Sequence, residues 1–343
     1  MNNIAIIIDH IEITWSAIFM VLVIPAWFFF AMAVYTAGKK KPGKKILALW
    51  VFLPFAILFS FLFCRILYWY SHQSRFDGLL NALTSKETDT FSILGIIPGI
   101  VLACALVRLF GLSKNLPAML DALAPATAFG TGFLYLTCRY HQSCLGRIVI
   151  TDERLFSLPI VSMALTGQGE IEYRPAIYFA GFLSMMIIGI LSLVFYFRHS
   201  GIKSKAAGKG SAAQKKQGAC ACFFLLYFSA AEFVLESARY DAGYFPFNGF
   251  VSIIQICAAA FILGIAIYFF VHAIKCTGFK IGYPFLLFGM LASMGLTGYL
   301  EYLVQRHGDK ALVIYAGMSV SCILMATFPL ILFYLGNREL SQK

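Results

Sequence analysis

Long apolar segments recur from one end of this chain to the other, with short polar stretches between them. Each segment holds about 20 residues, which is the length that an α-helix needs to cross the hydrocarbon layer of a bilayer. We expect nine spans, at about residues 13–37, 46–68, 91–111, 117–137, 175–197, 218–235, 247–273, 280–304 and 311–335. Since a spanning segment must satisfy its own backbone in lipid, the pattern predicts an all-α, polytopic integral membrane protein of about nine transmembrane helices.

Composition agrees with this pattern and removes one alternative. Hydrophobic residues make up 60% of the 343-residue chain, charged residues only 13%, and the mean hydropathy is +0.80. In a soluble protein, the formal net charge of +11 would suggest a nucleic-acid partner. Here the basic residues lie in short loops between spans, where they set topology, so we expect no nucleic-acid partner.

The distribution of basic residues predicts which side of the membrane each loop faces. With the amino terminus outside, 17 of the 27 lysines and arginines fall in inner segments and nine fall in outer segments. This excess favours an N-out, C-in orientation. The inner set is mostly lysine, including the flexible loop 201–218, whereas the outer set is mostly arginine. Topology explains the inner lysines, and the outer arginines need another reason.

The longest outer segment is the loop of residues 138–174, which carries Arg139, His141, Arg147, Arg154 and Arg174. Arginine binds phosphate through its planar fork of N–H donors. Several arginines at the outer membrane boundary therefore suggest a lipid head group as ligand. Within the loop, the apolar stretch 155–165 predicts a short helix lying in the interface.

The sequence gives no pattern for a metal or a cofactor, and we expect neither. The nine cysteines lack the paired spacing of a zinc site, and there is no glycine-rich phosphate loop. Gly130 and Gly132 are better explained by close helix packing. Cys138 and Cys144 face the outer side, and the sequence leaves open whether they are bridged.

Five short blocks near the predicted outer face combine arginine or aspartate with glycine, proline or aromatic residues. They are Phe63–Tyr68, Leu120–Ala126, Cys138–Arg147, Tyr173–Tyr178, and Glu236–Asp241 followed by Gly249–Gln255. In this order they resemble the bacterial prolipoprotein diacylglyceryl transferase family. The likeness spans about residues 13–273. It implies a seven-helix core in residues 1–275, including the outer loop 138–174, and two additional C-terminal transmembrane helices in residues 276–343.

The chain departs from the family pattern at several positions. The family signature begins with Gly-Arg where this chain has Leu134-Tyr135, and the Glu of the signature falls at Ser143. The family's His-Gly-Gly before its third helix falls near Leu94-Gly95-Ile96, so its histidine is absent. The chain therefore resembles a divergent member.

The resemblance implies a transfer reaction at the outer face of the bacterial cytoplasmic (inner) membrane. A diacylglyceryl group moves from phosphatidylglycerol to the lipobox cysteine thiol of a lipoprotein precursor, and glycerol phosphate leaves. The step needs arginines to hold phosphate, a base to take the thiol proton and a water-poor cavity open to lipid. The implied partners are a phosphatidylglycerol-like phospholipid, lipoprotein precursor signal peptides and the membrane itself.

By resemblance, Arg147 and Arg239 are the residues expected to bind phosphate, and Arg65 and Arg174 are expected to support them. The retained positions that complete the substrate-binding set are Tyr178, Gly146 and Asp241.

Arg139 and His141 have no counterpart in the family. Arg139 could replace the missing signature arginine if it turns inward, acting in catalysis with Arg239. His141 could replace the missing histidine as base, since histidine is the side chain best suited to proton transfer near neutral pH. The other interpretation of both residues is a solvated pair in a loop.

Three functions remain open on the sequence alone. The first is a divergent transferase that still moves a diacylglyceryl or related lipid group. The second is a non-catalytic relative that keeps the fold and binds lipid or a lipoprotein precursor, which the missing histidine and signature arginine favour. The third is an unrelated small-molecule transporter, against which the chain shows no inverted repeat and no matched pair of broken helices.

Overall fold

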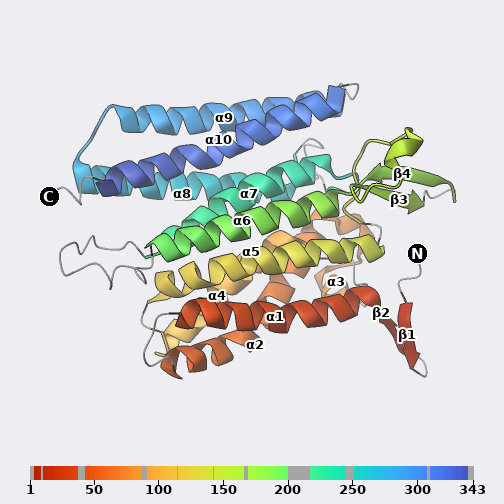
Figure 1. Ribbon diagram of the computed structural model, residues 1–343, viewed down its shortest axis with the longest axis horizontal. Coiled ribbons are helices and arrows are strands. Elements are labelled where there is room, and N and C mark those ends of the chain that lie inside the picture. Colours follow the sequence, from red (N-terminus) through yellow and green to blue (C-terminus); the bar gives the residue numbers. More distant parts are fainter. Residues whose placement is uncertain are drawn as a thin grey trace. The chain divides into compact units, whose positions relative to one another are not determined.

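The computed structural model describes residues 4–8, 11–37, 43–85, 91–113, 115–141, 143–165, 169–199, 217–243, 251–306 and 310–338. Ten α-helices and two small β-hairpins account for most of these residues (Figure 1). Of the inner loop expected at 201–218, residues 201–216 lie outside the described residues.

A helix occupies each of the nine predicted spans. The nine are α1 (Trp15–Thr36), α2 (Gly43–Ser71), α4 (Ile96–Leu109), α5 (Leu116–His141), α6 (Ile177–His199), α7 (Ala219–Ala238), α8 (Ile253–Thr277), α9 (Gly282–Arg306) and α10 (Ala311–Arg338). Within the described ranges, seven of them are long and apolar enough to cross a membrane; α4 is apolar but shorter, and α5 is not among the seven. The all-α polytopic class is confirmed, while the number of spans and their orientation stay predictions.

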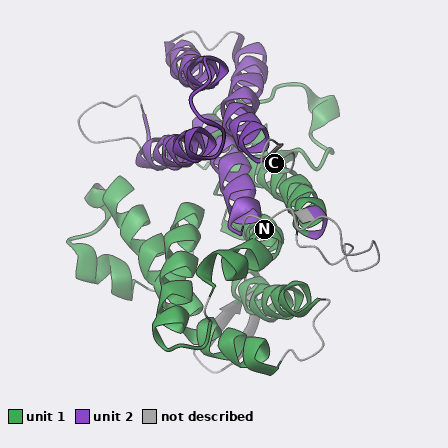
Figure 2. Ribbon diagram, turned by 90° about the vertical axis from the view of Figure 1, so that its left-hand side faces the viewer, with its two compact units in different colours: residues 1–196, 238–243 green, residues 197–237, 244–343 purple. Residues whose placement is uncertain are grey.

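The chain folds as two compact units (Figure 2). Unit 1 comprises residues 1–196 and 238–243, and unit 2 comprises residues 197–237 and 244–343. The division that the sequence predicts, at residue 275, stays a prediction.

Small residues bring the helices of unit 1 close together. Helix α2 packs on α4, and α1 packs on α5. A Cβ atom added at Gly99 would lie 2.5 Å from the backbone of Ser60, so only glycine fits that crossing. A Cβ atom at Gly130 would lie 3.0 Å from Trp27, and one at Gly132 would lie 3.1 Å from Met185. The expectation that Gly130 and Gly132 permit close packing is confirmed.

Polar side chains join the helices of unit 2. Helix α8 begins with a reciprocal cap, in which the Ser252 N–H donates to Gln255 Oε1 at 2.9 Å and the Gln255 N–H donates to Ser252 Oγ at 3.1 Å. The side-chain amide of Gln255 also donates to Glu301 Oε2 on α9 at 3.3 Å. Helix α10 packs on both α8 and α9.

The loop predicted to face outside, residues 138–174, contains a β-hairpin in place of the interfacial helix expected at 155–165, so that expectation is wrong. After a 3₁₀ turn at Glu153–Leu155, strand β3 (Val161–Leu165) pairs antiparallel with strand β4 (Ile171–Pro175). Taken alone, the apolar run looks like part of a helix. Its backbone hydrogen bonds are made to a second segment, β4, and the pattern of the run itself does not reveal that partner. A second hairpin joins β1 (Ile4–Ile8) to β2 (Ile11–Thr14).

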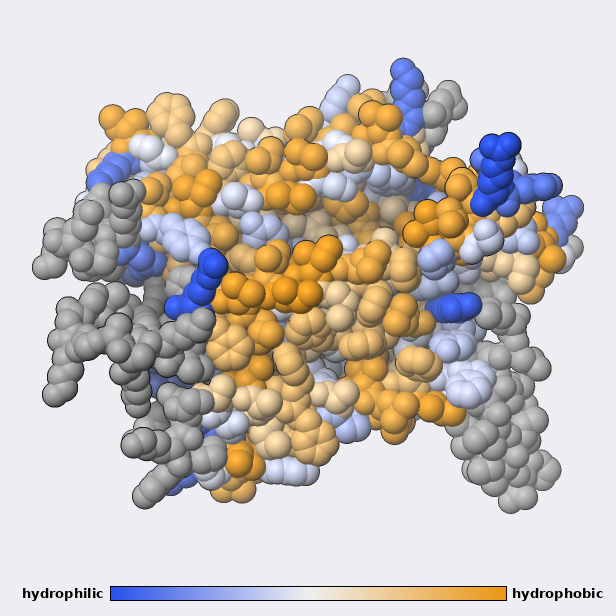
Figure 3. All heavy atoms as spheres, in the orientation of Figure 1, coloured by the Kyte–Doolittle hydropathy of each residue, from blue (hydrophilic) through white to orange (hydrophobic). Residues whose placement is uncertain are grey.

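On the face drawn in Figure 3, apolar residues dominate along the length of the helices and hydrophilic residues gather toward the helix ends. Exposed large apolar side chains are frequent on the helices; Leu22, Trp50, Ile187, Phe285 and Leu312 are examples. Such side chains suit contact with lipid tails, as a multi-pass membrane protein requires.

Candidate functional site

A cavity of about 750 Å³ lies within unit 1. Most of its wall is apolar and comes from α1, α2, α4 and α5; Val23, Ile24, Trp27, Ile57, Phe61, Ile96, Ile100 and Leu134 are examples. Its charged and titratable residues come from the carboxyl ends of α2 and α5 and from the segments that follow α2, α5 and α7. They include Tyr68, His72, Arg75, Cys138, His141, Cys144, Arg239 and Asp241. An apolar chamber with a charged end suits an amphipathic ligand.

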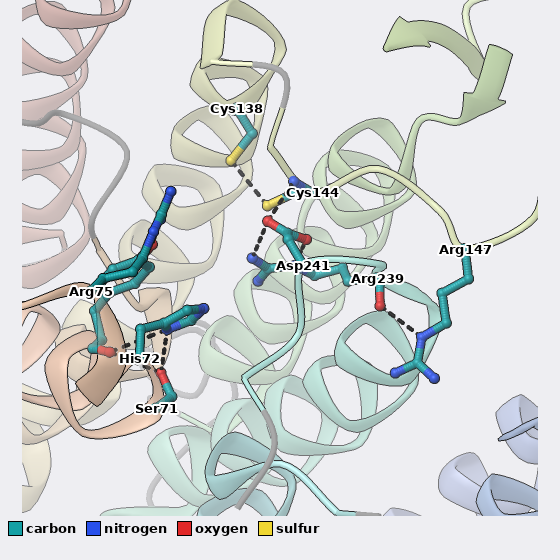
Figure 4. Close-up of polar contacts among 9 residues, drawn as sticks. Ser71, His72, Arg75, Cys138, Cys144, Arg147, Arg239 and Asp241 are labelled. Carbon is teal, nitrogen blue, oxygen red and sulfur yellow. Dashed lines mark hydrogen bonds and ion pairs between the residues drawn. The ribbon is translucent and has the colours of Figure 1, made fainter. Parts of the chain in front are cut away.

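Arg239 and Asp241 form a two-pronged ion pair in this polar end. Arg239 Nε donates to Asp241 Oδ1 at 3.0 Å, and Arg239 Nη2 donates to Asp241 Oδ2 at 3.0 Å (Figure 4). The Cys144 N–H donates to the same carboxylate at 3.2 Å. Burial pushes the pKa of the Asp241 carboxyl upward, but the charge and hydrogen bonds of Arg239 and the Cys144 N–H bring that pKa below its ordinary value.

Backbone hydrogen bonds hold three distant segments together around this pair. The Gly146 N–H donates to Pro175 O at 2.8 Å, the Arg147 N–H donates to Ala238 O at 3.1 Å, and the Tyr240 N–H donates to Leu145 O at 2.9 Å. A Cβ atom at Gly146 would lie 2.9 Å from the Pro175 ring, so glycine permits this approach. These three main-chain hydrogen bonds form a frame around Gly146, which fixes where the backbone of residue 239 lies.

The structure separates the two arginines expected to bind phosphate. Arg239 lines the cavity, whereas Arg147 is not among the residues that line it. Arg147 Nε donates to the carbonyl oxygen of Arg239 at 2.8 Å. In Figure 4 the two guanidinium groups lie on opposite sides of the Arg239 backbone. Arg147 therefore reaches Arg239 through the main chain.

Arg174 makes contacts that brace the loop. It pairs with Glu172 at 2.7 Å and donates to the carbonyl oxygens of Gly146 and Arg147 at 3.1 and 3.3 Å. Its guanidinium also lies 5.0 Å from the centre of the Tyr240 ring.

Arg65 is buried at the carboxyl-terminal part of α2. It donates to the carbonyl oxygens of Ala82, in α3 (Leu79–Thr84), and of Ser85, at 3.2 and 3.0 Å. Its guanidinium lies 4.4 Å from the centre of the Phe91 ring. These contacts tie α3 to α2.

The remaining sequence candidates divide between the cavity and other positions. His141 lines the cavity and is half-buried. Arg139 is exposed and is not among the cavity residues. Tyr178 is buried, and its backbone N–H donates to Cys144 O at 3.0 Å. Tyr135, which occupies the signature arginine position, is 1% exposed and packs against Gly181 of α6.

Among the cavity residues that were not predicted as site residues from the sequence are His72 and Arg75. The His72 ring stacks on the Tyr68 ring with centroids 4.2 Å apart, and Arg75 donates to the Tyr68 hydroxyl. Tyr68 and His72 are four residues apart, which places side chains on one face of a helix end. This spacing, at the end of a predicted span, is the sequence feature that could have identified His72 as a site residue.

Cys138 and Cys144 are both free thiols, with their sulfur atoms 3.2 Å apart. The hydrogen bond with Cys138, together with burial, raises the pKa of the Cys144 thiol well above its ordinary value. Among the described residues, no cluster of three or more His, Cys, Asp or Glu residues could hold a metal ion.

A family model described as prolipoprotein diacylglyceryl transferase matches residues 3–271, which is well over half of the chain. No curated protein matches the chain.

Proposed function

The chain belongs to the prolipoprotein diacylglyceryl transferase family, and on that premise we propose that it transfers a diacylglyceryl group from phosphatidylglycerol to the lipobox cysteine of lipoprotein precursors. Family membership supports a membrane transferase of lipoprotein biosynthesis. The donor lipid, the outer face of the cytoplasmic membrane and the signal-peptide partner belong to the proposal.

The observation that carries the proposal is the amphipathic cavity of unit 1. Its apolar walls suit acyl chains, and Arg239 stands at its polar end, where a phosphate would lie. In a site that excludes water, a guanidinium fork stabilises the negative charge that develops on the leaving phosphate. Arg239 is already oriented by Asp241, so little rearrangement is needed to bind the phosphate.

The other sequence candidates take supporting roles in this proposal. Arg147 and Arg174 hold the backbone of the loop that positions Arg239, and Arg65 holds the end of α2. Gly146 allows the close approach to Pro175, and Tyr178 anchors Cys144. The cavity supplies two histidines, His72 and His141, as candidate bases. Arg139 would contribute only if its side chain turned inward, because it is exposed.

The test is transfer by the purified protein in phosphatidylglycerol vesicles, using a lipobox peptide whose mass gain is measured. Complementation of a strain that lacks its own diacylglyceryl transferase is the cellular counterpart. We expect Arg239→Ala to lower turnover about 10²–10³-fold. Arg239→Lys should be nearly as damaging, since lysine keeps the charge but loses the fork. Arg154→Ala, at an exposed loop position, is the matched control and should leave turnover unchanged.

A second function is favoured by one observation, the burial of Tyr135 where the family has its signature arginine. A core tyrosine cannot hold a phosphate, so a protein that binds lipid without transferring it is the competing proposal. This second function would be favoured if the wild-type protein binds phosphatidylglycerol, Arg239→Ala does not, and no lipobox peptide gains mass.

A further inference from the structure

We propose that His72 is the catalytic base that removes the proton from the acceptor cysteine thiol. This inference rests on the proposed transfer reaction and names a residue for its proton-transfer step. It starts from the placement of His72 just after α2, among the polar residues of the cavity.

Hydrogen bonds from the backbone and from Ser71 hold the His72 ring in place. Nδ1 lies 3.2 Å from the carbonyl oxygen of Tyr68, an atom that can only accept. Nδ1 also lies 2.9 Å from Ser71 Oγ, whose single proton faces the carbonyl oxygens of Leu67 and Tyr68 at 3.1 and 3.0 Å. The carbonyl oxygen of Asp241 accepts a further hydrogen bond from the ring. These contacts fix the position of the imidazole, and its neutral form carries one nitrogen lone pair, which a base requires.

The ring is also held in one plane. It stacks on Tyr68 with a centroid distance of 4.2 Å and an interplanar angle of 10°. Tyr68 is itself buried and accepts a hydrogen bond from Arg75. In Figure 4 the ring of His72 projects toward the side on which Arg239 and Asp241 lie.

The surroundings favour the neutral, basic form of the imidazole. Burial lowers the pKa of His72 below its ordinary value; the carbonyl oxygens of Tyr68 and Asp241 oppose this, and the charges of Arg75 and Arg239 add to it. The ionisable groups around the ring are Tyr68 and Arg75 from its own segment and Arg239 and Asp241 from the segment after α7. Cys138, His141 and Cys144, from α5 and its following loop, line the same cavity.

The step balances without an oxidant or a reductant. The acceptor thiol gives its proton to the unprotonated ring nitrogen of His72, and the sulfur forms a bond to the glycerol carbon that carries the phosphate ester. The bond between that carbon and the ester oxygen breaks. Its electron pair leaves with glycerol phosphate, whose charge Arg239 stabilises.

The position where the family has its histidine offers no substitute. The residues that fall there, Leu94 and Gly95, are both buried, and a Cβ atom at Gly95 would lie 2.4 Å from the backbone of Cys64. Neither residue is among those that line the cavity. The end of α2 supplies an imidazole to the cavity from a different element.

The test measures transfer against pH with His72→Gln and His72→Asn in phosphatidylglycerol vesicles. Glutamine and asparagine keep a polar side chain but do not titrate in this range. We expect kcat to fall about 10²–10⁴-fold while lipid affinity stays unchanged. Because the pKa of His72 is lowered, wild-type activity should fall only below about pH 6.5, and this acid limb should be lost in both variants. His272→Gln, on α8 and outside the cavity lining, is the control that keeps wild-type kcat and pH profile.

Diethylpyrocarbonate, which modifies neutral imidazole, provides a measurement on the unaltered protein should a variant fold poorly. Loss of turnover should follow modification of His72 and should be slowed by phosphatidylglycerol. Wild-type kcat and an unchanged acid limb in the His72 variants would overturn the inference, as would loss of that limb in His141→Gln alone. Wild-type protein without any transfer would defeat the proposed function, which is a separate outcome.

Discussion

Arg239 and Asp241 lie two residues apart and face each other through two hydrogen bonds of 3.0 Å each. The carboxylate also accepts the N–H of Cys144, which is almost a hundred residues away in the chain. Asp241 thus orients the arginine and ties Cys144 to the segment that follows α7.

We predict that Asp241→Asn loosens Arg239 without removing its charge. Asparagine cannot accept both prongs of the guanidinium, and hydrogen bonds to charged groups are each worth about 1.5–3 kcal/mol. The variant should unfold at a lower temperature in detergent, and its turnover should fall. Thermal unfolding of Asp152→Asn, an exposed position, is the control and should match wild type.

The same pair predicts a dependence of stability on pH. The pKa of Asp241 is lowered in the folded state, so the pair stabilises the protein fully above the ordinary carboxyl value of 3.8. This contribution is lost as pH falls through the lower, folded-state value. The difference in unfolding temperature between wild type and Asp241→Asn should shrink in that acid range. If the difference in unfolding temperature stays unchanged in that acid range, the ion pair of Asp241 is not the source of the pH dependence.

Cys138 and Cys144 should form a disulfide when an oxidant is supplied. Their sulfur atoms are 3.2 Å apart, and a disulfide bond is about 2.05 Å long, so a small movement suffices. Oxidised glutathione should remove two titratable thiols from wild-type protein, forming one bond with release of two reduced glutathione molecules. Cys144→Ser should lose no thiol pair under the same treatment. Cys322→Ser, a buried thiol on α10, should still lose the pair.

Gly99→Ala should destabilise the crossing of α2 and α4. The added Cβ atom would lie 2.5 Å from the Ser60 backbone, which cannot swing aside as a side chain could. Overpacking of this kind costs about 1–3 kcal/mol. Thermal unfolding in detergent measures the loss. Gly264→Ala is the control, because a Cβ atom there meets nothing within 4 Å and alanine favours a helix.

The N-out, C-in orientation predicts which cysteines a membrane-impermeant reagent reaches. In a cysteine-free background, Asp152→Cys should react in intact cells, since the outer loop carries that position. Ser211→Cys should react only after the membrane is opened, since it lies in the lysine-rich loop. The reverse pattern would show that the orientation, and the outer position of the site, are wrong.

Deletion of residues 280–343 should leave a core that still inserts in the membrane. The truncated protein should be less stable, because Phe269 on α8 is buried and its ring stands 5.0 Å from that of Phe333 on α10. Protease resistance and membrane fractionation of the truncated chain measure this. Rapid degradation of the truncated chain would count against a separable addition.

The helices of this protein could be predicted from sequence because each is a local property. The length of an apolar run decides whether α1 or α8 can span a bilayer, and no distant residue changes that. The hairpin of β3 and β4 was not predicted, because each strand forms its ladder of hydrogen bonds with the other strand. A short apolar run such as 161–165 carries no sign of which partner it will meet.

The site was only partly predictable for a similar reason. Arg239 and His141 line the cavity. Their place near the ends of predicted spans had suggested such a role. Arg147 was expected beside Arg239 as an equal, but its side chain contacts the Arg239 carbonyl oxygen from the other side of the main chain. Which way a loop side chain points depends on tertiary contacts that spacing does not encode. His72 lay outside the resembling blocks and gained its importance only from the cavity.

The frame around Gly146 has a consequence for how this protein tolerates change over generations. Its links at residues 145–147, 175 and 238–240 are main-chain hydrogen bonds, which do not depend on side-chain identity. Most replacements along these segments would leave the links intact, with Gly146 the exception because its α-carbon faces the Pro175 ring. Signature residues can therefore drift while the backbone that carries Arg239 stays in register. A lineage that lost one arginine or histidine would retain a scaffold on which a neighbouring element could supply the missing group.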